Sequence, residues 1–283
     1  MSSTFKIGFI GAGNMGEAMI GALIQSKSID AGEIVAADIR ADRLDELHRK
    51  YGIAVHPGTF ALFDECGIVI LAVKPQTLPR VLTEIVSAED YGVRRRKLVI
   101  SIAAGIHLRR IESLLYSGLD DKQKKNLPII RVMPNTPALV LCAMSAMSSN
   151  AYCREEDRRA ARKILESMGS VIEVEEGFLD AVTAISGSGP AYVFYIIEAM
   201  VSAGEELGLA PSVAGTLAVQ TFKGAVKLLE ETGESAEKLR RNVTSPGGTT
   251  EAALHAFEQK NVKKHIKQAV HAAAKRAKEL SSI

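Results

Sequence analysis

The sequence predicts an α/β fold with two domains, a doubly wound parallel sheet followed by an all-helical domain. Three observations support this prediction. Short β-branched runs alternate with amphipathic segments as far as residue 174, the strand-like runs then stop, and helical patterns separated by Gly, Pro and Ser fill the rest of the chain. A chain of 283 residues is long enough for about two domains. We place their boundary so that the domains are 1–175 and 176–283.

Five β-branched runs are the predicted strands of the sheet. They lack a regular alternation of apolar and polar residues, which is typical of parallel strands covered by helices on both faces. The strand-helix alternation itself predicts that the strands lie parallel. The predicted strands are Lys6–Ile10, Ile34–Ala37, Ile68–Ala72, Leu98–Ile102 and Ile129–Met133.

The second domain is predicted from helix start signals. Pro190 stands at a first-turn position, Pro211 opens a second helix, and Ser235 can cap a third. The last segment, 262–280, has apolar residues at helical spacing with lysines between them. The helix near Pro190 is apolar on almost every side, within a stretch, 164–222, that contains no Lys or Arg. Such a helix must be buried, and a small helical domain has limited means of burying it alone, so we expect a homodimer.

The charge balance excludes a general binder of nucleic acid or acidic membranes. The chain has 35 Lys and Arg against 33 Asp and Glu, a net charge of +2, and neither domain carries a large basic excess. Two short basic runs, Arg94–Lys97 and Lys122–Lys125, are typical of solvated loops, with a phosphate-binding patch as the alternative.

Cysteine usage and the N-terminus indicate the compartment. The three cysteines, Cys66, Cys142 and Cys153, form no Cys-x-x-Cys pair, which argues for a reducing compartment and against a zinc site. No basic leader precedes the first strand. The apolar run 191–197 ends at Glu198, well short of the roughly 20 residues that a bilayer requires. We therefore expect a cytoplasmic protein with no membrane span.

A glycine-rich hexapeptide follows the first predicted strand. Gly11-Ala12-Gly13-Asn14-Met15-Gly16 leads directly into a helical pattern, 17–25. In the dinucleotide-binding fingerprint of a Rossmann domain, the first Gly allows a tight turn and the second lets the backbone approach a pyrophosphate. The third allows the helix to pack closely on the strand. The place of the motif at the first strand favours this interpretation over a glycine turn without a nucleotide.

An acidic residue supports the dinucleotide interpretation. Asp38 ends the second predicted strand, about 20 positions after Gly16, and can accept the hydroxyl hydrogen bonds of an adenosine ribose. That contact favours NADH. Arg40 can instead pair with the 2′-phosphate of NADPH, so the two residues conflict and we lean only slightly towards NADH. Thr59, near the start of the third helix, can reach the same ribose.

Further candidate residues follow the strands at the edge where an open α/β sheet binds its ligand. The strand at 68–72 runs into Ala72-Val73-Lys74-Pro75, and the strand at 98–102 runs into Ala103 and Ala104, whose small side chains leave room for a flat ring. In the loop Met133–Pro137, Asn135 offers a side-chain amide to a ligand. An ordinary exposed lysine and a purely structural turn are the alternatives for Lys74 and Asn135.

Two stretches stand out in the helical domain, Ser186–Tyr192 and Ser245–Thr250. The second opens a helix, so its free amides and hydroxyls form a concave cluster of donors suited to a carboxylate. A plain helix cap is the alternative, although two successive glycines are more than a cap requires. Neither stretch holds a strong general base, nucleophile or metal ligand, which limits the chemistry to what a cofactor supplies.

These motifs together resemble those of the pyrroline-5-carboxylate reductases, which make proline by reducing a cyclic imine. The resemblance covers nearly the whole chain, and the two stretches of the helical domain are its most specific parts. Its motifs are Gly-x-Gly-Asn-Met-Gly at 11–16, Ala-Val-Lys-Pro at 72–75, Ile-Ala-Ala-Gly at 102–105, Met-Pro-Asn-Thr-Pro-Ala at 133–138, Ser-Gly-Ser-Gly-Pro-Ala-Tyr at 186–192 and Ser-Pro-Gly-Gly-Thr-Thr at 245–250.

The resemblance implies a Rossmann domain, a helical dimerisation domain whose dimers often assemble into decamers, and a site between the domains. It implies NADH or NADPH as cofactor, with Val73, Pro75, Ala103 and Ala104 bordering the nicotinamide. The implied reaction turns 1-pyrroline-5-carboxylate into L-proline, the last step of proline biosynthesis, with the Thr250 hydroxyl near the ring nitrogen. The implied substrate-binding residues are Ser245, Gly247, Gly248, Thr249 and Thr250.

Two other classes of protein stay open at this point. The β-hydroxyacid dehydrogenases share the layout but use a catalytic lysine, which the lysine-free interval 164–222 does not supply. A nucleotide-sensing protein would bind a dinucleotide without turnover, and it would have little need for the stretch 245–250. The six-membered homologue of the imine is an alternative substrate, because one ring methylene discriminates by only about 1–3 kcal/mol.

Overall fold

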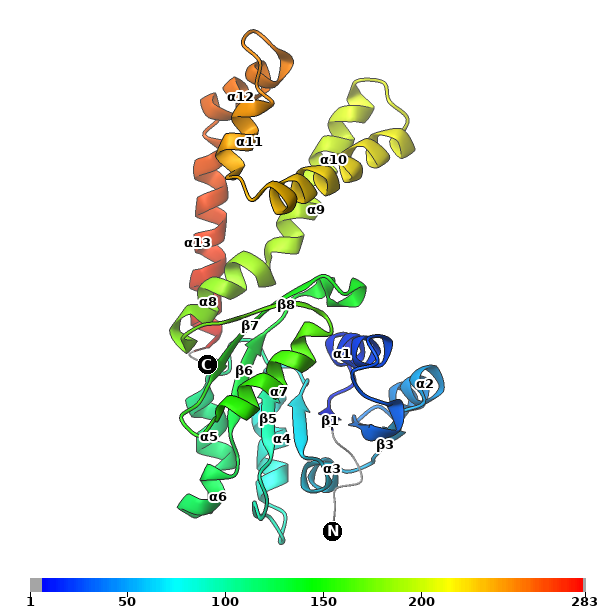
Figure 1. Cartoon of the computed structure of the whole chain (residues 1–283), viewed down its shortest axis with the longest axis vertical. Coiled ribbons are helices and arrows are strands. Elements are labelled where there is room, and N and C mark those ends of the chain that lie inside the picture. The colour runs from blue at the N-terminus through cyan, green and yellow to red at the C-terminus, as the bar shows by residue number, and fades with distance from the viewer. Residues whose placement is uncertain (1–6, 282–283) are drawn as a thin grey trace. The chain divides into compact units, whose positions relative to one another are not determined.

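The computed structural model describes residues 7–281, and the chain forms two compact units (Figure 1). The first unit comprises the described residues up to Ser188 together with the end of the chain from Ala273, and the second is Gly189–Ala272. The first unit therefore contains the predicted sheet, and the second contains most of the predicted helical domain.

The first unit is built on an eight-stranded sheet with the order β3-β2-β1-β4-β5-β6-β7-β8. Strand β1 lies between β2 and β4, where the order reverses. Strands β1 to β6 are parallel, β7 is antiparallel to β6, and β8 is parallel to β7. The strands are β1 (Ile7–Ile10), β2 (Ile34–Ala37), β3 (Ala54–Val55), β4 (Ile68–Leu71), β5 (Leu98–Ser101), β6 (Ile129–Met133), β7 (Ala143–Ser149) and β8 (Gly169–Glu173).

The five predicted strands are present, each within one residue of its expected ends, except that Lys6 lies outside the described residues. The five predicted strands run parallel, as expected, and β7, which the sequence did not predict, is antiparallel to β6. The sequence signal is weak there, because Ala143–Ser149 consists of Ala, Met and Ser without one β-branched residue.

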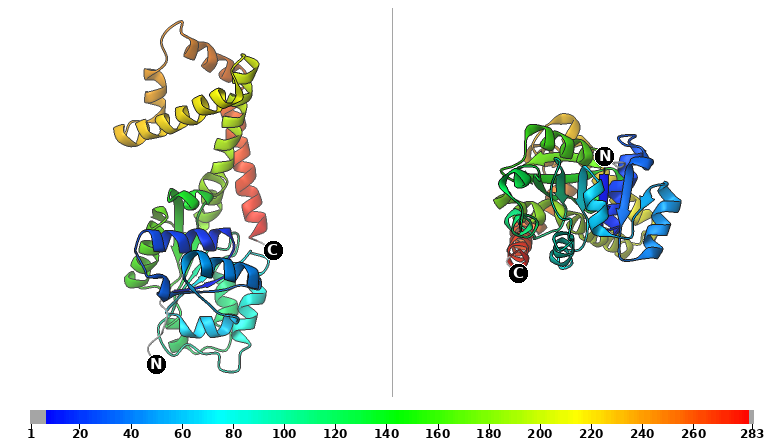
Figure 2. Two further views of the ribbon diagram at one scale, coloured as in Figure 1. Left: turned by 90° about the vertical axis from the view of Figure 1, so that its right-hand side faces the viewer. Right: turned by 90° about the horizontal axis from the view of Figure 1, so that it is seen from below.

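Helices cover both faces of the sheet (Figures 1 and 2). One face packs α1, α2 and α7 against strand residues such as Phe9 and Ile70, and the other packs α3, α4 and α5 against neighbours such as Ile10 and Leu71. Burial on both sides explains why the strands read as continuous apolar runs. The helices are α1 (Asn14–Gln25), α2 (Ala41–Tyr51), α3 (Thr59–Glu65), α4 (Leu78–Val86), α5 (Leu108–Leu115), α6 (Asp121–Lys125), α7 (Glu155–Glu166) and α8 (Leu179–Val182).

The second unit is helical. Helices α9 (Gly189–Glu206) and α10 (Pro211–Thr232) pack through small residues, since a Cβ added to Gly204 would lie only 2.9 Å from the Cβ of Ala214. The prediction that Ser235 caps a helix is confirmed, because its hydroxyl accepts a hydrogen bond of 3.2 Å from the Lys238 amide. The remaining helices are α11 (Ala236–Asn242), α12 (Thr249–Gln259) and α13 (Val262–Leu280), and the part of α13 from Ala273 belongs to the first unit.

Helix α9 is not buried within one chain. The buried residues of 189–272 are Gly204, Ala214 and Ala218, whereas 60% of Phe194 and 74% of Tyr195 are exposed. The burial that the sequence predicts for this helix is therefore not provided by the other helices of its unit. By length and composition alone, the helical run Glu176–Glu206 also meets the criterion for a membrane span, which the shorter run 191–197 does not.

The basic run 94–97 is only partly the solvated loop that we expected: Arg94 and Arg95 are exposed, whereas Lys97 is buried. Arg95 donates to the carbonyls of Asp64 and Glu65 at 3.0 and 2.9 Å, and the buried Lys97 donates to the Cys66 carbonyl. These cations satisfy the open carbonyls at the end of α3. Burial lowers the pKa of Lys97 from 10.5 to about 8.

The depressed pKa of Lys97 predicts a specific pH dependence of stability. The folded state disfavours the charged amine, so its contribution to the free energy of unfolding rises as the pH increases from about 8 to 10.5. Urea unfolding should show the wild type gaining about 2 kcal/mol relative to Lys97→Met over this interval. Lys122→Met, which replaces an exposed lysine, is the matched control, and the wild type should show no such gain relative to it. Parallel pH curves for wild type and Lys97→Met would contradict the assignment.

Candidate cofactor and substrate site

The glycine-rich loop joins β1 to α1, and each glycine has its own physical reason. Gly11 has a φ of +102°, and a Cβ there would lie 2.7 Å from the backbone of Ala72. A Cβ on Gly16 would lie 2.7 Å from the Gly11 carbonyl oxygen. A Cβ on Gly13, in contrast, would meet no atom within 4 Å. Gly11 and Gly16 thus permit close packing of the backbone, and Gly13 keeps an open approach to the loop.

The start of α1 presents unused donors beside that opening. The first helical hydrogen bond runs from the Glu17 amide to the Gly13 carbonyl, at 2.9 Å. The amides of Asn14, Met15 and Gly16 therefore lack an acceptor within the helix, and the helix dipole adds positive potential there. An accessible loop lined by amides fits the pyrophosphate of a dinucleotide.

Asp38 closes the loop onto the end of β2. Its Oδ2 accepts the Ala12 amide at 2.7 Å, its Oδ1 accepts the Arg40 amide at 3.0 Å, and 13% of its side chain is exposed. Each carboxylate oxygen keeps a lone pair for a ribose hydroxyl. The Arg40 side chain is 54% exposed, with its Nε 3.8 Å from Asp38 Oδ1. Asp38 and Arg40 thus both flank the loop. The structure therefore keeps both the residue that favours NADH and the residue that favours NADPH at this loop.

Backbone hydrogen bonds bring the predicted strand-end residues to the same edge. The Ala72 amide donates to the Ile10 carbonyl at 2.8 Å, and the Ile102 amide donates to the Leu71 carbonyl at 3.1 Å. The segment 72–75 and the pair Ala103 and Ala104 therefore follow neighbouring strands beside the glycine loop. Lys74 is exposed, and its carbonyl accepts the Thr77 amide at the start of α4.

Thr59 and Asn135 use their side chains inside the fold. Thr59 opens α3, and its hydroxyl donates to Glu84. Asn135 is 8% exposed: its Nδ2 donates to the Ser186 carbonyl at 3.0 Å, and its Oδ1 accepts the Met144 amide at 2.9 Å. Asn135 thereby ties the end of β6 to the stretch 186–192 and keeps one amide hydrogen for a ligand. Contacts of both residues with a cofactor stay predictions.

The stretch Ser245–Thr250 forms a tight loop in the helical unit. Gly247 has a φ of +70°, and the Gly248 amide donates to the Ser245 carbonyl at 3.0 Å. The first hydrogen bond of α12 runs from Ala252 to Gly248, so the amides of Thr249 and Thr250 precede it without an acceptor in the helix. The loop borders a hollow of about 830 Å³ lined by two cations, Arg240 and Arg241, and by two carboxylates, Glu251 and Glu258. The free amides at the start of α12 are the donors that suit a carboxylate.

Sequence reasoning missed Glu251, which shapes this loop. Its carboxylate accepts the Gly247 amide at 2.8 Å. Gly248 is the N-cap of α12, so Glu251 stands at the third helical position, where an acidic side chain commonly reaches back to the backbone before the helix. The three-residue spacing between Gly248 and Glu251 was the sequence signal from which this contact could have been predicted. Two amides of the loop, those of Gly247 and Gly248, are thus already engaged, and the amides of Thr249 and Thr250 have no acceptor within the helix.

The fold and these two loops define a class of protein, a Rossmann-type oxidoreductase with an added helical domain. Residues 6–105 match the family model described as "NADP oxidoreductase coenzyme F420-dependent". Residues 176–280 match the model described as "Pyrroline-5-carboxylate reductase dimerisation".

Known proteins resemble the chain over its whole length. It is 39% identical over 277 residues to a pyrroline-5-carboxylate reductase of Synechocystis, which covers 98% of each chain. It matches the structure of a pyrroline-5-carboxylate reductase from Coxiella burnetii with a TM-score of 0.86 and 36% identity, covering 98% of this chain and 99% of that one. A Plasmodium falciparum pyrroline carboxylate reductase with NADP bound matches with a TM-score of 0.83 and 29% identity, covering 99% and 100%.

The chain therefore belongs to the pyrroline-5-carboxylate reductase family and is an NAD(P)H-dependent oxidoreductase. Its helical domain is a dimerisation domain, and the apolar side chains of α9 are exposed on it. The predicted family, fold class and nicotinamide cofactor are confirmed.

The open space at Gly13 predicts a separation of folding from binding. Gly13→Ala places a methyl group where no protein atom lies within 4 Å, so thermal unfolding should change little. The same methyl group faces the cofactor, and calorimetric titration should show binding of NADH or NADPH weakened by about tenfold or more. Gly32→Ala, which also meets no atom, is the control. Cofactor binding by Gly13→Ala that equals the wild type would contradict this role of the loop.

Proposed function

We propose that the chain reduces 1-pyrroline-5-carboxylate to L-proline, the last step of proline biosynthesis, with NADH or NADPH as reductant. The observation that carries this proposal is the pairing of an accessible glycine loop in the sheet unit with the donor-rich loop Ser245–Thr250 in a chain of this family. The first suits a dinucleotide, and the second suits the carboxylate of a small substrate.

The cofactor is held by residues at the edge of the sheet. The free amides after Gly13 take the pyrophosphate, Asp38 and Arg40 contact the adenosine ribose, and Thr59 lies near it. When bound, the nicotinamide supplies a hydride to the imine carbon. Lys74 and Asn135 lie near the nicotinamide ring. The ring is bordered by the small or rigid residues at the strand ends, which are Ala72, Val73, Pro75, Ala103 and Ala104.

The substrate is held by the loop of the helical domain. The hydroxyl groups of Ser245 and Thr249 and the Thr249 amide surround the carboxylate, and Gly247 and Gly248 form the turn beneath it through their hydrogen bonds to Glu251 and Ser245. The Thr250 hydroxyl contacts the ring nitrogen. A cyclic imine that arrives protonated needs no further acid, because addition of hydride to carbon leaves the proton on nitrogen. The loop then accelerates the reaction by holding the substrate in a reactive orientation.

We also propose the assembly and location of the enzyme. The exposed face of α9 packs against a second copy in a homodimer, and five such dimers form a decamer. The even charge balance, with a net charge of +2, and the three free cysteines suit a cytoplasmic enzyme.

The role of Thr250 is tested by removing and restoring its hydroxyl. Thr250→Ala should lower kcat/KM for the imine by about tenfold or more, because a hydrogen bond to the reacting nitrogen is lost. The dissociation constants of NADH and NADPH should not change. Thr250→Ser keeps the hydroxyl and should recover most of the activity. Equal imine kinetics for wild type and Thr250→Ala would remove Thr250 from the reaction.

The role of Asp38 is tested through the choice of cofactor. Asp38→Asn keeps an oxygen for the Ala12 amide and removes the charge that repels a 2′-phosphate. The ratio of kcat/KM for NADPH to that for NADH should rise by about tenfold. Asp45→Asn, an exposed change on α2, serves as the control. If the ratio stays as in the wild type, Asp38 does not govern the preference.

A further inference from the structure

A buried arginine contacts the glycine loop from outside the fingerprint. Arg43 lies in α2 and is 9% exposed. Its Nε donates to the Ala12 carbonyl at 2.8 Å. Its Nη1 donates to Glu46 at 2.6 Å, and its Nη2 donates to Glu17 of α1. All three guanidinium nitrogens therefore hold an acceptor, and one acceptor is the backbone of the loop.

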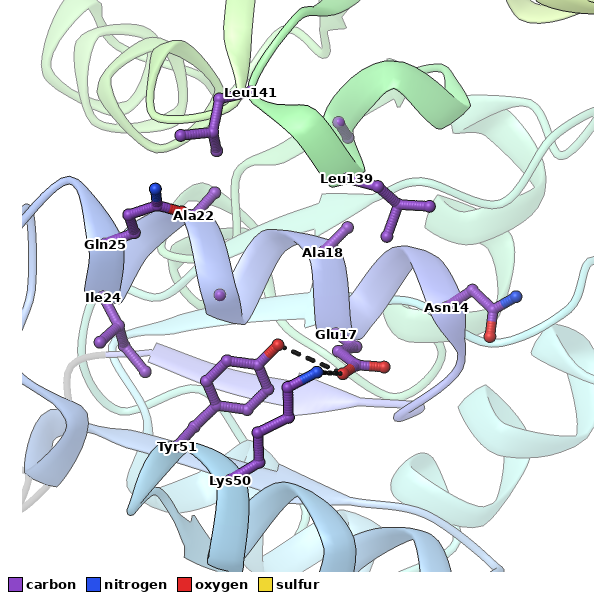
Figure 3. A pocket seen from close by; sticks show the side chains of 12 residues that line it. Asn14, Glu17, Ala18, Ala22, Ile24, Gln25, Lys50, Tyr51, Leu139 and Leu141 are labelled. Atoms are coloured by element: carbon purple, nitrogen blue, oxygen red, sulfur yellow. Dashed lines mark hydrogen bonds and ion pairs between the residues drawn. The ribbon is translucent and has the colours of Figure 1, made fainter. Parts of the chain in front are cut away.

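Glu17 holds Arg43 in place from the first turn of α1. Its other oxygen accepts Lys50 Nζ at 2.8 Å and the Tyr51 hydroxyl at 3.2 Å, both from the end of α2 (Figure 3). Burial raises the pKa of Glu17, but the hydrogen bonds from Lys50 and Arg43 outweigh it, and the pKa lies below its ordinary value. Glu17 is therefore a carboxylate at neutral pH, bound to α2 at three points.

The contact at Ala12 determines where the next amide points. The peptide unit between Ala12 and Gly13 is planar and trans, so its C=O and N–H groups point in opposite directions. Arg43 fixes the carbonyl towards α2, and the Gly13 amide therefore points away from Arg43. Asp38 fixes the preceding peptide through the Ala12 amide. The two side chains together determine the orientation of both peptides at the centre of the loop.

We propose that Arg43, held by Glu17, is a positioning residue for the dinucleotide: it orients the Ala12–Gly13 peptide so that the Gly13 amide faces the pyrophosphate. The proposal rests on cofactor binding by the glycine loop and not on the identity of the imine. It requires no contact between Arg43 and the 2′-phosphate, because its three hydrogen bonds run to the Ala12 carbonyl, Glu46 and Glu17.

The charges of this cluster favour a positional effect over an electrostatic one. Arg43 and Lys50 are balanced by Glu17 and Glu46, so the cluster adds little net charge near the pyrophosphate. NADH and NADPH share the pyrophosphate and differ only in the 2′-phosphate. A loss of loop orientation must therefore weaken both cofactors by the same factor.

Calorimetric titration of NADH and of NADPH, without imine, tests the proposal on the full-length protein. Arg43→Met should weaken both by about tenfold, since one charged hydrogen bond to the loop is lost. Arg43→Lys should bind as weakly, because one ammonium group cannot replace the three guanidinium contacts. Glu17→Gln should give a smaller loss, of about threefold, for both cofactors. Arg49→Met removes an exposed cation of α2 that does not touch the loop and should change neither constant.

Three results would overturn the proposal. The first is an unchanged dissociation constant in Arg43→Met, and the second is a loss confined to NADPH, which would make Arg43 a ligand of the 2′-phosphate. The third is binding by Arg43→Lys that equals the wild type, which would make the positive charge alone sufficient for cofactor binding. If Arg43→Met does not fold, the Arg43→Lys variant alone tests the proposal. In steady state, the KM for the cofactor should rise while kcat at saturating cofactor stays constant. A purely structural role would lower the melting temperature and leave both constants unchanged.

Discussion

The arrangement of the cofactor edge depends on the close approach of two backbones at the end of β1. Gly11 has no room for a side chain because the backbone of Ala72 lies where its Cβ would be. This approach allows the chain to leave β1 at the point where the strand order reverses, which is where an open α/β sheet has its ligand crevice. Gly16 repeats the constraint one turn later against the Gly11 carbonyl, and so directs the free amides of α1 to that edge.

The glycine loop and the loop Ser245–Thr250 are built on two different kinds of scaffold. The cofactor loop is set on a buried parallel sheet, where Asp38 and Arg43 hold its peptides from the side of β2 and α2. The substrate loop caps a helix of the dimerisation domain, where Glu251 fixes the turn at Gly247. In both loops a charged side chain organises backbone donors. In the proposed reaction, both loops serve to position their ligands.

Much of this could be predicted from the sequence because the signals are local. The strands are β-branched runs, the glycine loop follows the first of them, and Ser235 caps a helix at the expected position. The antiparallel β7 could not be predicted, because its Ala, Met and Ser residues carry little strand propensity and its place in the sheet depends on pairing with β6 and β8.

Contacts between distant residues were also beyond the sequence. Arg43 and Ala12 are far apart in the chain and meet only when α2 packs beside α1, and Asn135 meets Ser186 in the same way. Lys97 appeared within a basic run typical of solvent, but β5 places it against the end of α3. The apolar character of α9 predicted burial, whereas most of its apolar side chains are exposed in the single chain.

The central claim is that the chain transfers a hydride from a reduced nicotinamide to a cyclic imine. The most direct test follows the absorbance of NADH, and separately of NADPH, with the purified protein and 1-pyrroline-5-carboxylate, and measures L-proline at the end. The account predicts loss of reduced nicotinamide only when the imine is present, with one L-proline formed for each nicotinamide oxidised. Binding of both cofactors without imine-dependent oxidation of either would contradict it.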